Sequence, residues 1–190
     1  TIQIWSEIAG YYSEEELIGG YDLINEPVLP AGVTLEEFKQ LYIDITDAIR
    51  EVDNNHIVYI EGNWYGTDFS GLTPPWDDNM SYSFHKYWGE TSLGTIQSYI
   101  SMSNQYDIPL WMGESGENSN HWYYEVFTLL EENNIGWNFW THKKVEKISS
   151  PFSAVVTPQY QTLINYWSGN GSQPSDRKST RLNSSHSEIS

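Results

Sequence analysis

The chain has 190 residues, which is enough for one domain with a substantial core but short for a closed eight-stranded barrel of about 250 residues. It is strongly acidic, with 26 Asp and Glu against 9 Lys and Arg, so phosphate backbones and anionic membrane surfaces would repel it. We therefore expect no nucleic-acid partner and no membrane partner. The sequence has no cysteine, which excludes disulfides and cysteine-based metal sites or nucleophiles.

Aromatic residues make up 15% of the chain, including 9 Trp and 14 Tyr. Flat rings with polar edges suit the apolar faces of sugars, and they also fill hydrophobic cores. The composition therefore favours a sugar-binding protein, with core packing as the alternative for any single ring.

Apolar, β-rich runs alternate with helical patterns along the chain. A short helix is expected over 5–12, and strands are expected over 20–25, 56–61, 81–85, 109–113 and 136–140. A capping box of Thr34 and Glu37 opens the next helix, whose expected apolar face comprises Phe38, Leu41, Ile45, Ala48, Ile49 and Val52. Further helices are expected over 95–105, 122–133 and 158–167.

Continuous apolar strands that alternate with helices predict an α/β fold with a parallel sheet. A doubly wound sheet would fit this pattern, but no strand is followed by a glycine-rich phosphate loop. Each strand instead ends in polar or aromatic residues. Reactive groups at the carboxyl ends of successive strands are typical of the (β/α)8 TIM barrel, which we therefore favour.

Two of these strands end in a glutamate, Glu26 and Glu114, which are 88 residues apart (114 − 26). A pair of carboxyl groups is the minimum equipment for cleaving a glycosidic bond, one to donate a proton and one to attack the anomeric carbon. Like charges at the required distance favour one protonated and one ionised group. The alternative is that both are ordinary carboxylates in salt bridges or helix caps.

Four motifs occur in order along the chain: Asn25-Glu26-Pro27, His85-Lys86-Tyr87, Trp111-Met112-Gly113-Glu114 and Trp137-Asn138-Phe139-Trp140. Together they resemble glycoside hydrolase family 5, the cellulase-like retaining glycosidases. The resemblance implies that Glu26 ends the fourth barrel strand as acid/base and that Glu114 ends the seventh as nucleophile. It also implies a partial barrel, strands four to eight with their helices, because only one helix precedes Glu26.

The same resemblance assigns substrate-binding roles to five further residues, Asn25, His85, Tyr87, Trp140 and Trp64. Asn25 would hydrogen-bond the sugar 2-hydroxyl, Tyr87 would orient the nucleophile, and His85 would line the cleft. Trp140 would form a platform under the sugar, with Trp64 as a further lining residue. The alternatives are a turn-capping role for Asn25, a core histidine, a core aromatic, and a surface loop around Trp64.

Residues 1–168 are assigned to the carboxyl-terminal portion of the barrel, and 169–175 to a polar linker. Residues 176–190 lack periodicity and core residues; they resemble a translated sequencing adapter, and we expect them to be disordered. The chain begins at Thr1 rather than Met, so strands one to three and any leader are expected to be missing. The location is unknown, with secretion favoured for the full-length parent.

No group of His, Asp and Glu has the sequence spacing of a metal site, so we expect neither a metal nor a cofactor. The expected function is retaining hydrolysis of a β-linked oligo- or polysaccharide, with β-1,4-glucan as the default substrate. A β-mannanase, an exo-acting β-glucosidase or a non-catalytic carbohydrate-binding barrel are the alternatives. We expect a monomer at full length, and a poorly folded, inactive polypeptide for the 190 residues alone, since an open barrel exposes strand edges.

Overall fold

The computed structural model describes residues 1–147, 149–150 and 152–174. The expected adapter-like tail, 176–190, lies outside the described residues. The chain divides into two compact units, one from Thr1 to Trp140 and a second that begins at Thr141. The segment 141–168, which the sequence assigns to the barrel, therefore lies in the second unit.

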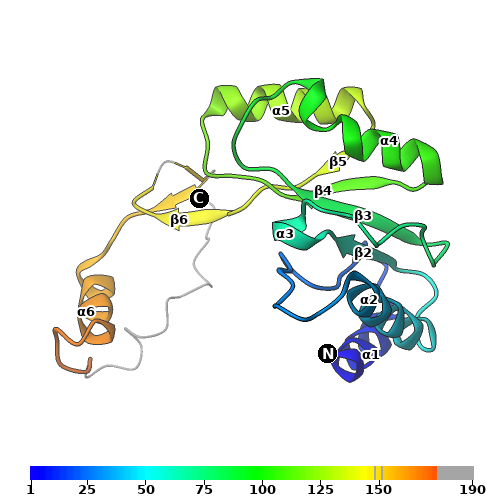
Figure 1. Cartoon of the computed structure of the whole chain (residues 1–190). Coiled ribbons are helices and arrows are strands. Elements are labelled where there is room, and N and C mark those ends of the chain that lie inside the picture. Colours follow the sequence, from blue (N-terminus) through cyan, green and yellow to red (C-terminus); the bar gives the residue numbers. More distant parts are fainter. Residues whose placement is uncertain (148, 151, 175–190) are drawn as a thin grey trace. The chain divides into compact units, whose positions relative to one another are not determined.

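The first unit is built on a sheet of five parallel strands whose spatial order equals their order in the sequence (Figure 1). The strands are β1 (Gly20–Asp22), β2 (Ile57–Glu61), β3 (Met80–His85), β4 (Leu110–Glu114) and β5 (Gly136–Trp137). All five expected strands are thus present, although β1 and β5 are shorter than expected. The fold is the α/β half-barrel that the sequence predicts.

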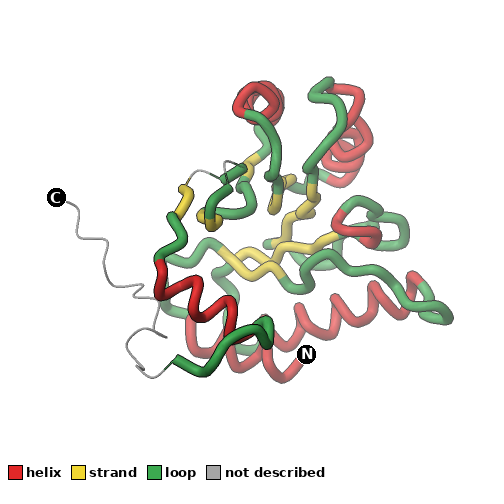
Figure 2. Tube along the Cα trace, turned by 90° about the vertical axis from the view of Figure 1, so that its left-hand side faces the viewer, coloured by secondary structure: helices red, strands yellow, loops and turns green. Residues whose placement is uncertain are grey.

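Helices follow the strands in alternation. They are α1 (Ile2–Tyr12), α2 (Leu35–Arg50), α3 (Asn63–Gly66), the 3-10 turn η1 (Leu93–Thr95), α4 (Gln97–Tyr106) and α5 (Asn120–Glu132). In both Figure 1 and Figure 2, α4 and α5 lie above the strands and α1 and α2 lie below them. The described residues contain no helix that is both long and apolar enough to cross a membrane.

Helix α2 shows how the sequence builds the core. Thr34 accepts a hydrogen bond from the Glu37 backbone and Glu37 bonds back to the Thr34 backbone, which confirms the capping box. The apolar face differs from the expected one, because Leu41 and Val52 are exposed and Tyr42 is buried instead. Tyr42 continues the buried stripe that four-residue spacing sets, and its hydroxyl is satisfied by the Glu61 carbonyl oxygen at 2.9 Å.

The pairing of β3 with β4 contains an irregularity that matters for the site. Phe84 is opposite Met112, but the next residue, His85, is opposite Glu114, so Gly113 is passed over. A Cβ atom on Gly113 would collide with the Ser83 hydroxyl, and only glycine fits there. The bulge places Glu114 directly beside His85.

The amino-terminal end of the sheet is closed by a polar network around Arg50. Its guanidinium makes a bidentate ion pair with Asp77, at 2.9 Å from Nε and 2.8 Å from Nη2. The same group donates to the backbone carbonyls of Asp53, His56 and Asn79. Arg50 thereby ties the end of α2 to the starts of β2 and β3.

Asp53 forms a second part of this network. Its carboxylate lies 2.6 Å from His56 Nδ1 and accepts a 2.7 Å hydrogen bond from the Tyr21 hydroxyl. The other ring nitrogen of His56 lies 3.0 Å from the Glu15 carbonyl. Burial alone would raise the pKa of Asp53, but hydrogen bonds from Tyr21, Asn55 and His56 outweigh it and lower that pKa.

The second unit contains two short strands and a helix. Strands β6 (Lys143–Val145) and β7 (Phe152–Ala154) pair with each other in a two-stranded sheet that the sequence did not predict. Helix α6 (Pro158–Trp167) begins after Thr157, whose side chain accepts a hydrogen bond from the Tyr160 backbone. This helix coincides with the expected one over 158–167.

Candidate active site

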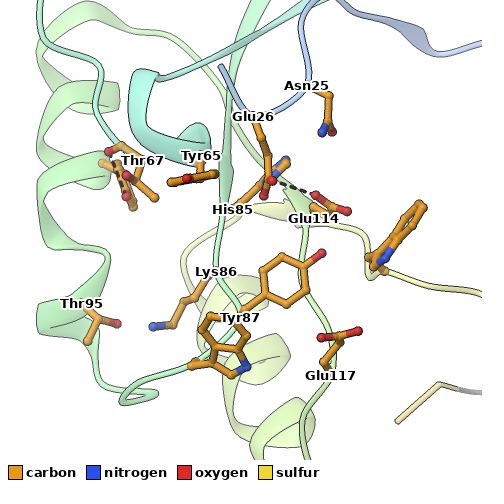
Figure 3. A pocket seen from close by; sticks show the side chains of 13 residues that line it. Asn25, Glu26, Tyr65, Thr67, His85, Lys86, Tyr87, Thr95, Glu114 and Glu117 are labelled. Atoms are coloured by element: carbon orange, nitrogen blue, oxygen red, sulfur yellow. Dashed lines mark hydrogen bonds and ion pairs between the residues drawn. The ribbon is translucent and has the colours of Figure 1, made fainter. Parts of the chain in front are cut away.

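The carboxyl ends of the strands line a cavity of about 1110 Å³ in the first unit (Figure 3). The lining residues come from strand ends, from the loops that follow the strands, and from α3, η1 and α4. They are Asn25, Glu26, Tyr65, Thr67, His85, Lys86, Tyr87, Trp88, Thr95, Tyr99, Glu114, Glu117 and Trp140. Most of the predicted site residues therefore meet in one place.

Glu26 lies in the bend that follows β1. Its backbone adopts a left-handed conformation with φ of 45°, which is uncommon for a residue other than glycine. Its backbone N–H donates a 2.6 Å hydrogen bond to the Glu61 carboxylate, and its own carboxylate lies 3.0 Å from His85 Nδ1. The bend thus turns the Glu26 side chain toward the other strand ends.

Glu114 is the last residue of β4, and its carboxylate contacts the same atom from the other side. The distance from Glu114 Oε2 to His85 Nδ1 is 3.0 Å, equal to that of Glu26 Oε1. The contacting atoms of Glu26, His85 and Glu114 all lie within 4.8 Å of one another. Figure 3 shows the two carboxylates pointing toward each other beside the imidazole.

His85 is the charged centre of this cluster. Its side chain is only 4% exposed, and its Nε2 lies 3.2 Å from the Glu61 carboxylate. Burial would lower the pKa of His85, but the hydrogen bonds to Glu61 and Glu26 and the charges of Glu61 and Glu114 raise it to about 9. The imidazole is therefore cationic at neutral pH.

Asp22, the last residue of β1, adds a further carboxyl group to this cluster. It interacts with Glu61 and with Ser83, whose Oγ is 3.4 Å from Asp22 Oδ2. Burial and the Glu61 charge raise the pKa of Asp22 to about 7. Asp22 therefore holds a proton more tightly than an ordinary aspartate.

Tyr87 and Trp140 flank Glu114. Burial and a hydrogen bond to the Glu114 carboxylate raise the pKa of Tyr87, so the phenol keeps its proton and donates it in that bond. The Trp140 ring is 54% exposed, and its backbone N–H donates to the Ser115 carbonyl. A Cβ atom on Gly116 would collide with the Trp140 carbonyl, so a glycine is needed where these two segments meet.

The two remaining predicted residues lie differently. Asn25 is exposed and lines the cavity beside Glu26. Trp64 is 57% exposed, and the cavity is lined by its neighbour Tyr65 rather than by Trp64 itself. Both of these aromatic residues have left-handed backbone angles, with φ of 54° and 61°. The role of Trp64 stays a prediction.

Several cavity residues were assigned no role from the sequence. Lys86, Trp88 and Glu117 lie in loops after the strands, where sequence alone gives no orientation. Glu61 was noted only as one of several polar strand ends. Its signal was present, because it ends β2 as Glu114 ends β4.

Glu26, His85 and Glu114 are close enough together for a metal ion, although the sequence predicted no metal site. The three residues are separated by 59 and 29 positions in the sequence (85 − 26 and 114 − 85), so they form no local metal-ligand pattern. Two carboxyl groups beside an imidazole are also the side chains that proton transfer uses.

Comparison with protein families gives a match that covers the whole of the first unit. The model for cellulase (glycosyl hydrolase family 5) matches residues 1–145. Among curated proteins, a β-xylosidase from Phanerodontia chrysosporium is 30% identical over 107 residues, which is 55% of this chain and 22% of that protein. Endoglucanase C from Acetivibrio thermocellus is 23% identical over 226 aligned residues, covering 86% of this chain and 64% of the relative.

Solved structures share the fold at lower identity. The cellulose synthase subunit Z from Clostridioides difficile has a TM-score of 0.63 and 17% identity, over 73% of this chain and 58% of that one. An endoglucanase from Thermotoga maritima has a TM-score of 0.60 and 20% identity, over 73% and 57%. The chain thus spans less than two thirds of the length of these relatives.

Proposed function

Since the chain belongs to glycosyl hydrolase family 5, we propose that it carries the catalytic pair of a retaining glycoside hydrolase, with Glu26 as acid/base and Glu114 as nucleophile. The supporting observation is their shared contact with His85 Nδ1, at 3.0 Å each. Retaining glycosidases hold their carboxyl groups about 5–5.5 Å apart, whereas inverting enzymes leave about 6.5–9.5 Å for a water. Contacting atoms within 4.8 Å of one another fit the retaining class.

In the first step, a Glu114 carboxylate oxygen attacks the anomeric carbon and forms an ester bond. The bond from that carbon to the glycosidic oxygen breaks, and the departing oxygen takes the proton of Glu26. In the second step, Glu26 removes a proton from water, the water oxygen attacks the anomeric carbon, and the Glu114 carboxylate leaves. Two inversions retain the stereochemistry of the sugar.

The neighbouring groups have roles that follow from their contacts. The Tyr87 hydroxyl holds the Glu114 carboxylate in position through its hydrogen bond. Cationic His85 lies against both carboxylates and balances the negative charge of Glu114 before attack. Asn25 would bond the sugar 2-hydroxyl, and the exposed Trp140 ring would stack on the sugar face.

We propose a β-1,4-glucan as the substrate, because several of the similar proteins are endoglucanases. The exposed rings of Trp88 and Trp140 both line the open cavity and would support an extended chain of sugars. The similarity to a β-xylosidase keeps other β-glycans in the set to be tested.

The half-barrel also leads to a proposal about completeness. Within the described residues, β1 and β5 each pair with only one neighbour, so both outer edges of the sheet are open. We propose that further strands, supplied outside this chain, close the barrel in the full-length protein. The 190 residues alone should then be poorly folded and inactive, while the full-length protein is active.

The test measures reducing-sugar release from carboxymethyl-cellulose by both polypeptides. Activity of the full-length protein alone supports the proposal, and equal activity of the two contradicts the proposed completion. In the full-length protein, Glu26→Gln should abolish turnover while cellooligosaccharide binding persists. Unchanged turnover in Glu26→Gln would rule out Glu26 as the acid/base. A wild-type protein that binds cellooligosaccharides but does not cleave them would instead be a carbohydrate-binding barrel.

A further inference from the structure

Glu61 is a buried carboxylate that the proposed reaction does not use. It is 1% exposed, at the end of β2, and lies behind the cavity wall. A carboxylate that deep is rarely retained without partners, because desolvation of the charge is costly. Its partners are two groups of the candidate site.

The first partner is the backbone of Glu26. Glu61 Oε2 accepts the Glu26 N–H at 2.6 Å, where the Glu26 backbone is left-handed with φ of 45°. Residues other than glycine disfavour the left-handed conformation. That conformation therefore persists only where neighbouring groups restrain the backbone. The bond from Glu61 is one such restraint, and it acts on the residue proposed to donate the proton.

The second partner is the ring of His85. An imidazole has two nitrogens, and Glu61 Oε1 lies 3.2 Å from Nε2. With Nε2 held, the ring presents Nδ1 to Glu26 and Glu114, at 3.0 Å from each. A single carboxylate thus fixes both the backbone of one proposed catalytic residue and the imidazole that contacts both of them.

Glu61 is itself held in place. Its carbonyl oxygen accepts the hydroxyl of buried Tyr42 at 2.9 Å, which anchors the end of β2 to α2. Gly66, with φ of 74°, packs over the cluster, where a Cβ atom would lie 3.3 Å from Glu61 Oε2 and 3.2 Å from His85 Cγ. The glycine leaves room for the carboxylate and the ring to meet.

We propose that Glu61 is a positioning residue, which sets the Glu26 backbone and the His85 ring so that both carboxylates face the scissile bond. This inference rests on the proposed function. Glu61 does not reach the cavity, so it acts only through Glu26 and His85.

The test uses Glu61→Gln in the full-length protein. Glutamine has nearly the same shape, but its one carbonyl oxygen can accept from either the Glu26 N–H or the protonated His85 ring, while its NH2 group opposes the other donor. We expect kcat to fall at least ~10-fold with KM changed less than ~3-fold, since small misplacements of catalytic groups act on the transition state. Wild-type kcat would overturn the proposal.

A matched control is Asp53→Asn, which removes the charge from the other buried carboxylate and histidine pair, remote from the cavity. This variant should lose stability but keep the kcat of the folded protein. An equal loss of kcat in both variants would mean that any buried charge serves, and would overturn a specific role for Glu61. If Glu61→Gln does not fold, Glu61→Asp takes its place, because aspartate keeps the charge but its side chain is too short to make both contacts. Wild-type kcat in Glu61→Asp would also overturn the proposal.

A second readout does not depend on turnover. The charged and titratable groups that face His85 are Asp22 from β1, Glu26 from the bend, Glu61 from β2 and Glu114 from β4. In an NMR titration the His85 pKa of about 9 should fall by at least one unit in Glu61→Gln. An unchanged His85 pKa would contradict the contact between Glu61 and His85. If the wild-type protein has no turnover, the proposed function is refuted, and the NMR titration still tests that contact.

Discussion

Each end of β2 carries a buried carboxylate that faces a histidine ring, and the two ends use that pair differently. At the amino end, Asp53 and His56 are 2.6 Å apart, and the surrounding donors and acceptors are matched by Tyr21, Arg50 and backbone groups. At the carboxyl end, Glu61 and His85 are 3.2 Å apart, and the ring also contacts Glu26 and Glu114. At the amino end, the carboxylate and the ring find their hydrogen-bond partners within the network. At the carboxyl end, several carboxylates lie close together beside an open cavity.

The difference separates stability from function. The amino end holds α2, β2 and β3 together, and its carboxylates gain from every contact they make. The carboxyl end collects four carboxyl groups around one imidazole, a concentration of like charge that we propose serves catalysis. In barrel enzymes the amino-terminal face serves stability and the carboxyl-terminal face serves catalysis, and we propose the same division for this half-barrel.

The largest expected effect is the loss of activity when a carboxylate at the carboxyl end of the sheet is replaced. Glu114→Gln in the full-length protein should lower kcat/KM by about 10⁴-fold or more, because no other group near the anomeric carbon can form the ester. Its melting temperature should change little, because the variant loses an attraction to cationic His85 and at the same time a repulsion from the nearby Glu26 carboxylate. Cellulose-derivative hydrolysis and thermal melting check both parts, and lost stability with retained turnover would reverse the comparison.

A smaller effect is the loss of stability when the buried carboxylate at the amino end of β2 is replaced. Asp53→Asn should destabilise the folded state by about 3 kcal/mol, because it leaves His56 and Tyr21 without their buried charged partner. Denaturant titration measures this loss, and kcat normalised to folded protein should stay at the wild-type value. The exposed Glu51→Gln serves as a control and should change stability by less than about 0.5 kcal/mol.

The smallest effect is the pH dependence of stability. The raised His85 pKa gives stabilisation that is complete below its ordinary value of 6.5 and is lost as pH rises through about 9. The raised Asp22 pKa, about 7 against 3.8, makes stability fall between those values as pH rises. The lowered pKa values of Asp53 and Asp77 give stabilisation that is lost as pH falls below about 4.

These contributions place maximum stability near pH 4, with a decline from there that Asp22 causes up to about pH 7 and His85 causes up to about pH 9. Urea midpoints measured from pH 3 to pH 9.5 test the profile, and His85→Gln should remove the decline above pH 7. A midpoint that rises between pH 7 and pH 9 would contradict the assignment of the His85 charge.

The sequence predicted the five strands, their parallel order and most of the helices, because apolar periodicity and capping signals are local. It could not choose between the Leu41 and Tyr42 faces of α2, since the tyrosine is buried only because the Glu61 carbonyl satisfies its hydroxyl. Strands β6 and β7 were missed because they are three residues each and carry little pattern.

Most of the residues that the sequence named for the site line one cavity, but the geometry of that cavity was not predictable. Family motifs pointed to Glu26, His85 and Glu114, all of which line the cavity. The bulge at Gly113, which sets Glu114 beside His85, follows from contact with the neighbouring strand and has no signal in a single segment. Glu61 was overlooked for the same reason, because its importance lies in partners 35 and 24 residues away in sequence (61 − 26 and 85 − 61).

The central claim is that Glu114 forms a covalent bond with the sugar while Glu26 handles the proton. The most direct measurement treats the full-length protein with a 2-fluoro cellobioside that carries a good leaving group, followed by peptide mass spectrometry. We expect one sugar adduct per molecule, on the peptide that contains Glu114, and no adduct in Glu114→Gln. An active enzyme that forms no adduct, or forms it on another residue, would contradict the account.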